Sequence, residues 1–368
     1  MLVDPASPVA SGSMHKTDFR STAFLRPAQA LFEEIGLWSA FSRHAVPLQA
    51  LRIVDATGEP PQVRAERVFR AQDMGDGPLG WNFLNWVIRK ELLSHLGKQP
   101  NFELRFGTGF RNMLNRTTGA MATLTSGAQI LAQLVIGADG RNSAVRDAVG
   151  INSRTTRYGQ KALAFIATHV HRHNNVSTEI YHEGGPFTMV PLADIDGKPA
   201  SAIVWMNRAR KTVDLAGLEP QAFNAQMTRR AANLFGPMEL ASDRAIWPII
   251  SQRAARLTAD HTALIAEAAH VLPPIGAQGL NTSLNDVAAL LLAAQTFPEE
   301  IGGAAMLNMY ERARHRDIAN RVRVIDLFNR VTRSGDIGLQ SLRLAGLKAV
   351  HDIQPLRRTL MRAGMGPL

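Results

Sequence analysis

The segment "ALIAEAAHVLPPIGAQGLN", residues 263–281, decides how the rest of the sequence is interpreted. An apolar run typical of a buried strand leads to Glu267, and prolines and glycines follow before an apolar run with helical spacing. The backbone at Gly276 and Gly279 can approach a ligand closely, because glycine has no Cβ. A helix that begins near Leu280 would direct unpaired N–H groups and its positive dipole end at an anionic ligand such as phosphate. A glycine-rich turn that caps an ordinary helix also explains these residues.

A second segment, "LVIGADGRNSAVR" at residues 134–146, has the same strand-to-helix pattern. Its apolar run leads into Gly137 and Asp139, and Ser143 and Arg146 open a helix. An aspartate at the carboxyl end of a strand can accept hydrogen bonds from ligand hydroxyls or from neighbouring backbone N–H groups. The segment is also a common strand-to-turn sequence, so neither segment alone identifies a ligand.

The remaining sequence divides into regions of different pattern. Strand-to-helix patterns lie before residue 155 and after residue 255, whereas residues 160–250 are rich in strand-like runs. The spacing predicts a helix within residues 26–38, with Pro27 near its first turn and Gly36 at its end, a helix over residues 85–96, and one helical stretch near residues 220–235. The sequence therefore predicts an α/β fold in which a second, sheet-based domain interrupts the first.

The composition excludes several classes of protein. The 368 residues include no cysteine, which rules out disulfides, thiolate catalysis and cysteine-ligated metals. No apolar run reaches the roughly 20 residues that a membrane span needs. The first residues lack the pattern of a secretory signal, so we expect a cytoplasmic protein. The histidines lack metal-ligand spacing, and no serine lies in a G-x-S-x-G turn.

The net charge of +10 has two possible meanings. The basic residues are dispersed and form no long run, so we do not expect a nucleic-acid partner. Basic and apolar residues recur at helical spacing within residues 336–368, as in helices that lie on anionic lipid. An amphipathic helix that docks on its own protein would have the same pattern.

Taken together and in this order, the two segments resemble those of the FAD-dependent aromatic hydroxylases of the para-hydroxybenzoate hydroxylase class. "GADGRNSAVR" is similar to their Asp-Gly motif. "AEAAHVLPPIGAQGLNTSLNDV" is similar to their second flavin motif, Gly-Asp-Ala-Ala-His, then Pro, then Gly-Gln-Gly-x-Asn and a later Asp. Within the class, "DFRSTAFL", "LRIVDATG" and "PLRRTLMRAGMGP" are most similar to the ubiquinone-biosynthesis hydroxylases, so the resemblance covers nearly the whole chain.

The resemblance implies a discontinuous domain organisation. Residues 1–47, 75–155 and 255–335 would form a Rossmann-like FAD-binding domain of the glutathione-reductase type. Residues 48–74 and 156–254 would form a mixed β-sheet substrate domain, and residues 336–368 an amphipathic, helical C-terminal segment.

The resemblance also assigns the cofactor contacts. Glu267 takes the place of the acid that binds the flavin ribityl chain, and Asp139 is the acid of the Asp-Gly motif. Asp4 would bond the adenosine ribose, and Arg20 and Arg89 would reach the cofactor. The isoalloxazine ring would be lined by two prolines and would meet the backbone of five further residues: Pro273, Pro274, Gly276, Gln278, Gly279, Leu280 and Asn281.

The implied activity is hydroxylation of a prenylated phenol in ubiquinone biosynthesis. NADH or NADPH would reduce the FAD, and O₂ would give a C4a-hydroperoxide that transfers oxygen to the ring. The chemistry is carried by the cofactor, so no catalytic side chain is expected. A lipid-soluble substrate would give the C-terminal segment a reason to contact the inner face of a membrane, and a ubiquinone-biosynthesis complex is a further expected partner.

The sequence departs from the family pattern at two places. Ala266-Glu267 replaces Gly-Asp, which keeps the carboxylate but adds a methylene. No G-x-G-x-x-G unit precedes residue 30, and "MLVDP" resembles the second strand of the family. We therefore expect the chain as given to bind FAD weakly. Either a start codon placed too far downstream or a true truncation would explain the missing unit. The alternative function is that of a non-catalytic homologue that acts as a binding partner in a biosynthetic complex.

Overall fold

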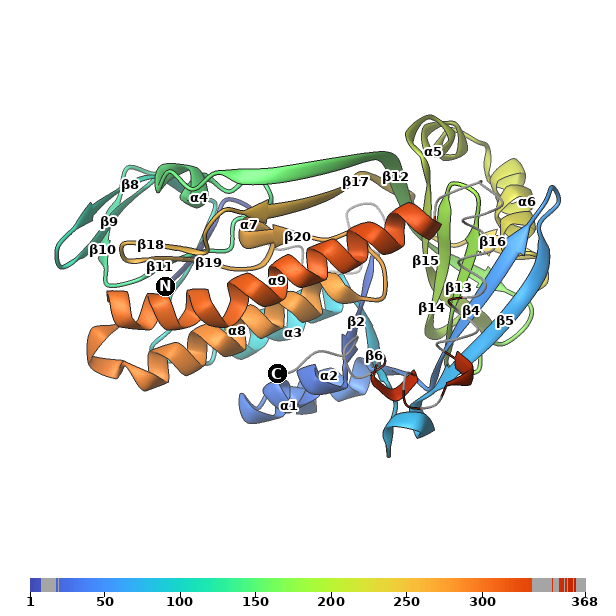
Figure 1. Ribbon diagram of the computed structural model, residues 1–368, viewed down its shortest axis with the longest axis horizontal. Helices are drawn as coiled ribbons and strands as arrows, with labels where there is room; N and C mark the ends of the chain where they lie inside the picture. Colours follow the sequence, from blue (N-terminus) through green and yellow to red (C-terminus); the bar gives the residue numbers. More distant parts are fainter. Residues whose placement is uncertain are drawn as a thin grey trace.

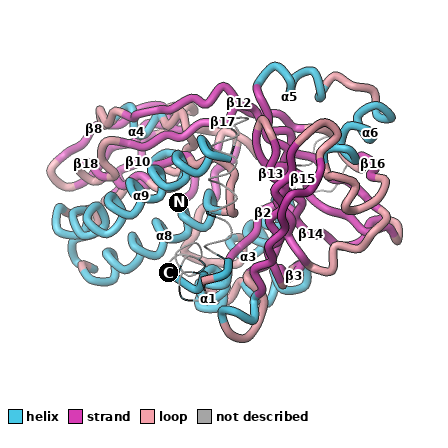
Figure 2. The backbone as a smooth tube through the Cα atoms, turned by 45° about the vertical axis from the view of Figure 1, so that its right-hand side comes forward, coloured by secondary structure: helices cyan, strands magenta, loops and turns pink. Residues whose placement is uncertain are grey.

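The computed structural model describes residues 1–7, 18, 20–332, 346, 351–353, 355, 357–359 and 361. Two regions lie side by side along the longest axis of the molecule (Figure 1). One contains a large β-sheet, and the other contains the long helices α8 (Gln278–Thr296) and α9 (Ala304–Thr332) together with smaller sheets. Figure 2 shows β13, β14 and β15 of the large sheet on one side and α8 and α9 on the other, with β12 and β17 reaching across between them.

The large sheet has nine strands in the order β20-β17-β12-β15-β14-β13-β4-β5, and β16 pairs with β12. Strands β13 and β4 are parallel, whereas the other pairs are antiparallel, so the sheet is mixed. Its strands are β4 (Ala50–Thr57), β5 (Gln62–Arg70), β12 (Ser153–His169), β13 (Val176–His182), β14 (Gly185–Ile195), β15 (Lys198–Arg208), β16 (Met238–Leu240), β17 (Ala245–Ala254) and β20 (His270–Val271).

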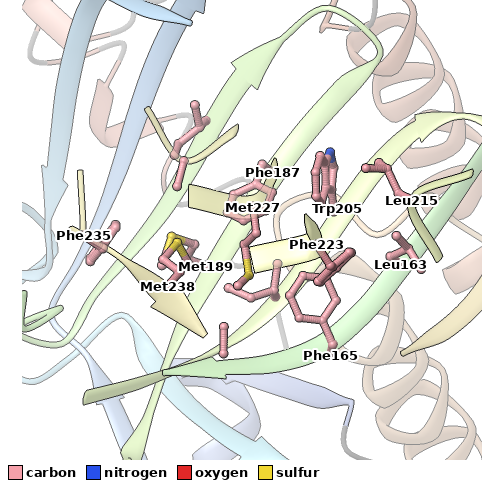
Figure 3. Close-up of a cluster of buried hydrophobic side chains, with 14 of the residues drawn as sticks. Leu163, Phe165, Phe187, Met189, Trp205, Leu215, Phe223, Met227, Phe235 and Met238 are labelled. Carbon is pink, nitrogen blue, oxygen red and sulfur yellow. The ribbon is translucent and has the colours of Figure 1, made fainter. Parts of the chain in front are cut away.

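One face of this sheet packs against α5 (Ala209–Ala216) and α6 (Pro220–Arg230). Side chains alternate between the two faces of a strand, and Ile203 and Trp205 of β15 point to the helices. They meet Phe223 and Met227 of α6 in a core that Figure 3 shows in close-up. Burial of each such side chain stabilises the fold by roughly 1.5–3 kcal/mol, so this packing holds α5 and α6 against one face of the sheet. The other face is left open to a ligand.

The second region packs α8 and α9 against short strands. Its core includes Leu264, Leu290, Met306 and Tyr310. Its parallel strands lie in two separate sheets, β1–β7 and β11–β19–β18, and an antiparallel sheet, β10–β9–β8, completes it. The elements are β1 (Leu2–Asp4), β7 (Leu104–Phe106), β8 (Phe110–Arg116), β9 (Gly119–Leu124), β10 (Gln129–Ala132), β11 (Val135–Gly137), α4 (Ala144–Ala148), β18 (Thr258–Ala259), β19 (Thr262–Leu264), α7 (Ala266–Ala269) and the 3₁₀ helix η3 (Pro298–Glu300).

A third, smaller unit joins the two regions. Its three strands, in the order β2-β6-β3, pack with helices around the rings of Phe24, Phe32, Phe41 and Phe83. Its elements are β2 (Ser21–Leu25), α1 (Arg26–Glu34), α2 (Trp38–Phe41), η1 (Ser42–His44), β3 (Val46–Leu48), η2 (Ala71–Met74), β6 (Gly80–Leu84) and α3 (Asn85–Leu96).

The α/β fold class with a mixed sheet is confirmed, and α3 has the predicted bounds. The helix predicted to end at Gly36 is confirmed, because α1 runs to Glu34 and Gly36, with φ of 71°, follows it before α2 begins. Helix α5 was not predicted. The domain boundaries stay a prediction, and most of the segment 336–368 lies outside the described residues.

Candidate functional site

A cavity of about 370 Å³ lies against the face of the large sheet that α5 and α6 leave open. Strands β13, β14, β15 and β17 line one side, and β2 and β6 line another. The third side is residues 272–277, which join β20 to α8 and are called the glycine loop below. Most of the wall is apolar, as in pockets that hold organic ligands.

The glycine loop exposes its backbone to this cavity. Gly276 and Ala277 both have left-handed backbone angles, with φ of 61° and 56°. A Cβ added to Gly279 would meet no atom within 4 Å, so this side of α8 is open. No side chain caps the first N–H groups of α8, whose cap residue is Ala277. Bare backbone beside an uncapped helix start fits the polar edge of a planar heteroaromatic ring.

The side chain of Asn281 holds the glycine loop to the neighbouring unit. Its Nδ2 donates to the carbonyl oxygens of Ala23 at 2.8 Å and Ala277 at 2.7 Å, and its Oδ1 accepts from the N–H of Leu25 at 2.9 Å. These bonds use the side chain fully, so Asn281 fixes the loop rather than facing the cavity.

Gln278 is held from two directions. Its Nε2 donates to the carbonyl oxygen of Gly276 at 3.0 Å, and its Oε1 accepts from Arg321 of α9 at 2.9 Å. The loop is therefore anchored to α9 as well as to β2.

A buried network lies beneath the loop, around Asp286 of α8. Its carboxylate accepts from His270 at 2.6 Å, from the N–H of Ala266 at 3.0 Å and from Arg314 at 2.8 Å. Ala266 has φ of 54°, a conformation that favours glycine and explains why a glycine suits this position. The histidine therefore has a structural partner.

Two arginines converge on one carboxylate near the cavity. Asp18 accepts from Arg20 at 2.7 Å and from Arg89 at 2.9 Å. Burial raises the pKa of Asp18, but the hydrogen bond and charge of Arg20 and the charge of Arg89 outweigh it, so the net pKa is lowered. Arg20 also lies over the ring of Trp247, 5.7 Å from its centre.

The remaining predicted acids lie in different surroundings. Glu267 is half-exposed at the cavity and lies 3.7 Å from Arg141. Asp139 accepts from the Ser143 hydroxyl at 2.5 Å and from the N–H of Val145 at 3.0 Å, so it stabilises the start of α4. Asp4 ends β1 and accepts from the N–H of Ala6 at 2.8 Å.

The structure brings most of the predicted residues together. Those that line the cavity are Arg20, Glu267, Pro273, Pro274, Gly276, Gln278, Gly279 and Leu280. Asp4, Arg89, Asp139 and Asn281 do not line it.

Among the polar residues of the cavity wall that the sequence analysis missed, two are buried. Asn82 of β6 is fully buried, and its Nδ2 donates to the carbonyl oxygen of Pro191 at 3.0 Å. Its Oδ1 has no hydrogen-bond partner among the described residues. Glu179 of β13 is 6% exposed and accepts a hydrogen bond from the Tyr181 hydroxyl, and the nearby N–H of Gly276 lowers its pKa. No local signal marked Glu179, because the sequence of its strand, VSTEIYH, is mostly polar although the strand is buried.

The described part of the chain contains no group of three or more histidine, aspartate or glutamate side chains placed to hold a metal ion. It also contains no helix that is both long and apolar enough to cross a membrane.

Comparison with known proteins agrees with this geometry. Residues 15–324 match the family described as "FAD binding domain". The chain is 32% identical to "Ubiquinone hydroxylase UbiL" of Rhodospirillum rubrum, with 99% of this chain and 82% of that protein covered. It is 24% identical to "3-demethoxyubiquinol 3-hydroxylase" of Escherichia coli, with 99% and 92% covered. The crystal structure of Klebsiella pneumoniae HpxO complexed with FAD and uric acid superposes with a TM-score of 0.75 at 16% identity, covering 95% of this chain and 88% of that one.

Proposed function

The chain belongs to the FAD-binding-domain family of flavoprotein monooxygenases, and on this premise we propose that it hydroxylates a prenylated phenol in ubiquinone biosynthesis. The proposal rests on one observation, which is that two different walls line the same cavity. The glycine loop forms one wall and the open face of the large sheet forms the other. A cofactor ring on the first wall would then contact an aromatic substrate on the second.

The glycine loop and the residues around it would hold the FAD. The backbone from Gly276 to Gly279 would meet the pyrimidine edge of its ring, and Pro273 and Pro274 would lie along the ring. Arg20 and Glu267 would bind the more polar part of the cofactor, and Asp4, Arg89 and Asp139 are proposed as further contacts. When bound and reduced by NADH or NADPH, FAD supplies the activation of O₂ for insertion into an aromatic ring.

The protein contributes position and exclusion of water. Apolar side chains of the sheet, including Val190, Ala202 and Val204, would orient the ring of the substrate and keep water out. The names of the two relatives place their activities in the ubiquinone pathway. The apolar cavity wall supports a substrate of the same class here.

Contact with a membrane surface is part of the proposal, because a prenylated substrate dissolves in lipid. Val324 and Leu327 near the end of α9 are exposed, with 67% and 65% of their surface accessible, and Arg323 and Arg330 lie beside them. Apolar and basic residues together fit an anionic lipid surface. Co-sedimentation with phosphatidylglycerol vesicles, but not with phosphatidylcholine vesicles, would support this contact.

The cofactor site is tested with one added methyl group. Gly279→Ala would place a Cβ in open space, so the folded chain should keep its stability while losing FAD affinity by about tenfold or more. Gly217→Ala, at the end of α5 and remote from the cavity, is the matched control. Flavin fluorescence during titration with FAD measures the affinity. Unchanged affinity of Gly279→Ala would show that the ring lies elsewhere.

The activity itself is tested by incubation with NADH or NADPH, O₂ and ortho-prenylphenol. Mass spectrometry should find a product with one additional oxygen atom, formed in proportion to the NAD(P)H oxidised. Consumption of NAD(P)H without oxygenated product would refute the proposed function.

A further inference from the structure

Glu179 is a buried carboxyl group that the proposed cofactor chemistry does not use. It lies on β13, on the open face of the large sheet, and it lines the cavity. In the part of the chain that the structure describes, it forms no ion pair. A buried acid without a cationic partner is costly to maintain, which indicates a functional role.

The position of Glu179 joins the two walls of the cavity. The backbone N–H of Gly276, in the glycine loop, approaches its carboxylate closely enough to lower its pKa. On the sheet side the carboxylate accepts a hydrogen bond from the hydroxyl of Tyr181, two residues along the same face. A carboxylate has about four lone-pair sites, so it can accept a further hydrogen bond from a ligand in the cavity.

Its electrostatic surroundings favour a base. Burial raises the pKa of Glu179 above the ordinary value of a glutamate, while the hydrogen bonds from Tyr181 and Gly276 oppose the rise. A carboxyl group with a raised pKa accepts a proton more strongly than one in water.

The neighbouring elements contribute little charge at this point. On β14, Thr188 lies opposite Glu179, and on β4 Asp55 lies opposite Tyr181 and pairs with Arg64. From α9, Phe328 packs against the ring of Tyr181. The other charged side chains of the cavity wall come from outside the sheet: Arg20, Arg141 and Glu267.

We propose that Glu179 is a catalytic residue that binds the hydroxyl group of the phenolic substrate and accepts its proton as the ring is oxygenated. The O–H bond of the phenol breaks, its electron pair stays on the phenol oxygen, and a new O–H bond forms on the carboxylate. The greater electron density on oxygen passes into the ring and favours attack by an electrophilic oxygen. This role rests on the proposed function, because it requires a phenol in the cavity.

A binding experiment tests the first half of the proposal without turnover. Trp247 lines the cavity, so tryptophan fluorescence can report the binding of ortho-prenylphenol and of its methyl ether, which has no proton to donate. Wild-type protein should prefer the phenol by about tenfold to 100-fold, as expected for a hydrogen bond to a charged acceptor. Glu179→Gln should lose most of this preference. Glu183→Gln, an exposed glutamate paired with Arg208, should keep it.

The pH dependence of turnover by the FAD-loaded enzyme tests the second half. In the wild type, kcat/KM should fall at low pH as Glu179 takes up a proton, and Glu179→Gln should lose this limb together with roughly 100-fold or more of its rate. Tyr181→Phe removes a bond that lowers the pKa of Glu179, so its limb should move to higher pH. The shift expected for Tyr181→Phe tests the role of Glu179 even if Glu179→Gln fails to fold.

The outcomes separate the two proposals. If no variant and no wild-type protein oxygenates the phenol, the proposed function fails. If the wild type oxygenates it, but Glu179→Gln keeps both the preference for the phenol and the low-pH limb, the role of Glu179 is refuted while the function stands. A low-pH limb at the same pH in Tyr181→Phe as in the wild type would also refute the role of Glu179.

Discussion

Replacement of Asp286 by alanine should strongly destabilise the protein. The Asp286 carboxylate is fully buried and accepts three hydrogen bonds, from His270, from the N–H of Ala266 and from Arg314. Removal of one partner of a buried ion pair costs about 3–5 kcal/mol, because the remaining charge stays buried. Arg314 keeps a second bond, at 2.7 Å, to the part-exposed carboxylate of Asp317, so we expect the lower end, about 3 kcal/mol.

The free energy of unfolding is measured by urea denaturation followed by far-UV circular dichroism. Asp286→Asn keeps the shape but removes the charge, and it should cost roughly 1.5–3 kcal/mol. Asp194→Ala, which breaks an exposed pair with Arg172, is the matched control and should cost about 1 kcal/mol or less. A loss below about 1 kcal/mol for Asp286→Ala would refute the view that this buried network stabilises the fold.

The remaining predictions concern the backbone, the junction of the two regions and the arginine cluster. Ala266→Gly should raise the free energy of unfolding by about 0.5–1 kcal/mol, because φ is 54° at this position. An unchanged free energy of unfolding, measured in urea, would show that the backbone is not strained there. Burial, together with Asp326, raises the pKa of Tyr158 to about 12, above its unfolded value near 10, so its contribution to stability is complete below pH 10 and is lost as pH rises through 12. The difference in the free energy of unfolding between wild type and Tyr158→Phe should therefore shrink as the pH rises from 10 to about 12. A constant difference would contradict the raised pKa of Tyr158. The lowered pKa of Asp18 has the opposite sign, so its contribution is present above the unfolded value near 3.9 and is lost as pH falls through the lower folded value. Asp18→Asn should remove this acid-dependent part of the urea midpoint, whereas equal acid sensitivity of mutant and wild type would exclude a stabilising pair with Arg20.

Local features of the sequence predicted much of the fold. The apolar spacing of residues 85–96 predicted α3 correctly, since nearby residues decide whether a helix can form. The end of the first helix at Gly36 was predicted as well, because glycine readily adopts the left-handed backbone that follows a helix, here with φ of 71°. Helix α5 was missed because its polar residues resemble those of a loop, while contact of Leu215 with the sheet core stabilises it.

The sequence by itself determined where backbone could meet a ligand, because the absence of a Cβ at Gly276 and Gly279 is a property of single residues. Only the tertiary structure decided which side chains surround that ligand. The acid of Glu179 reaches the N–H of Gly276 through the packing of a strand against a distant loop, and no local pattern encodes that meeting. Propensity acts over a few residues, whereas the burial that raises the pKa of Glu179 depends on every element that closes the cavity.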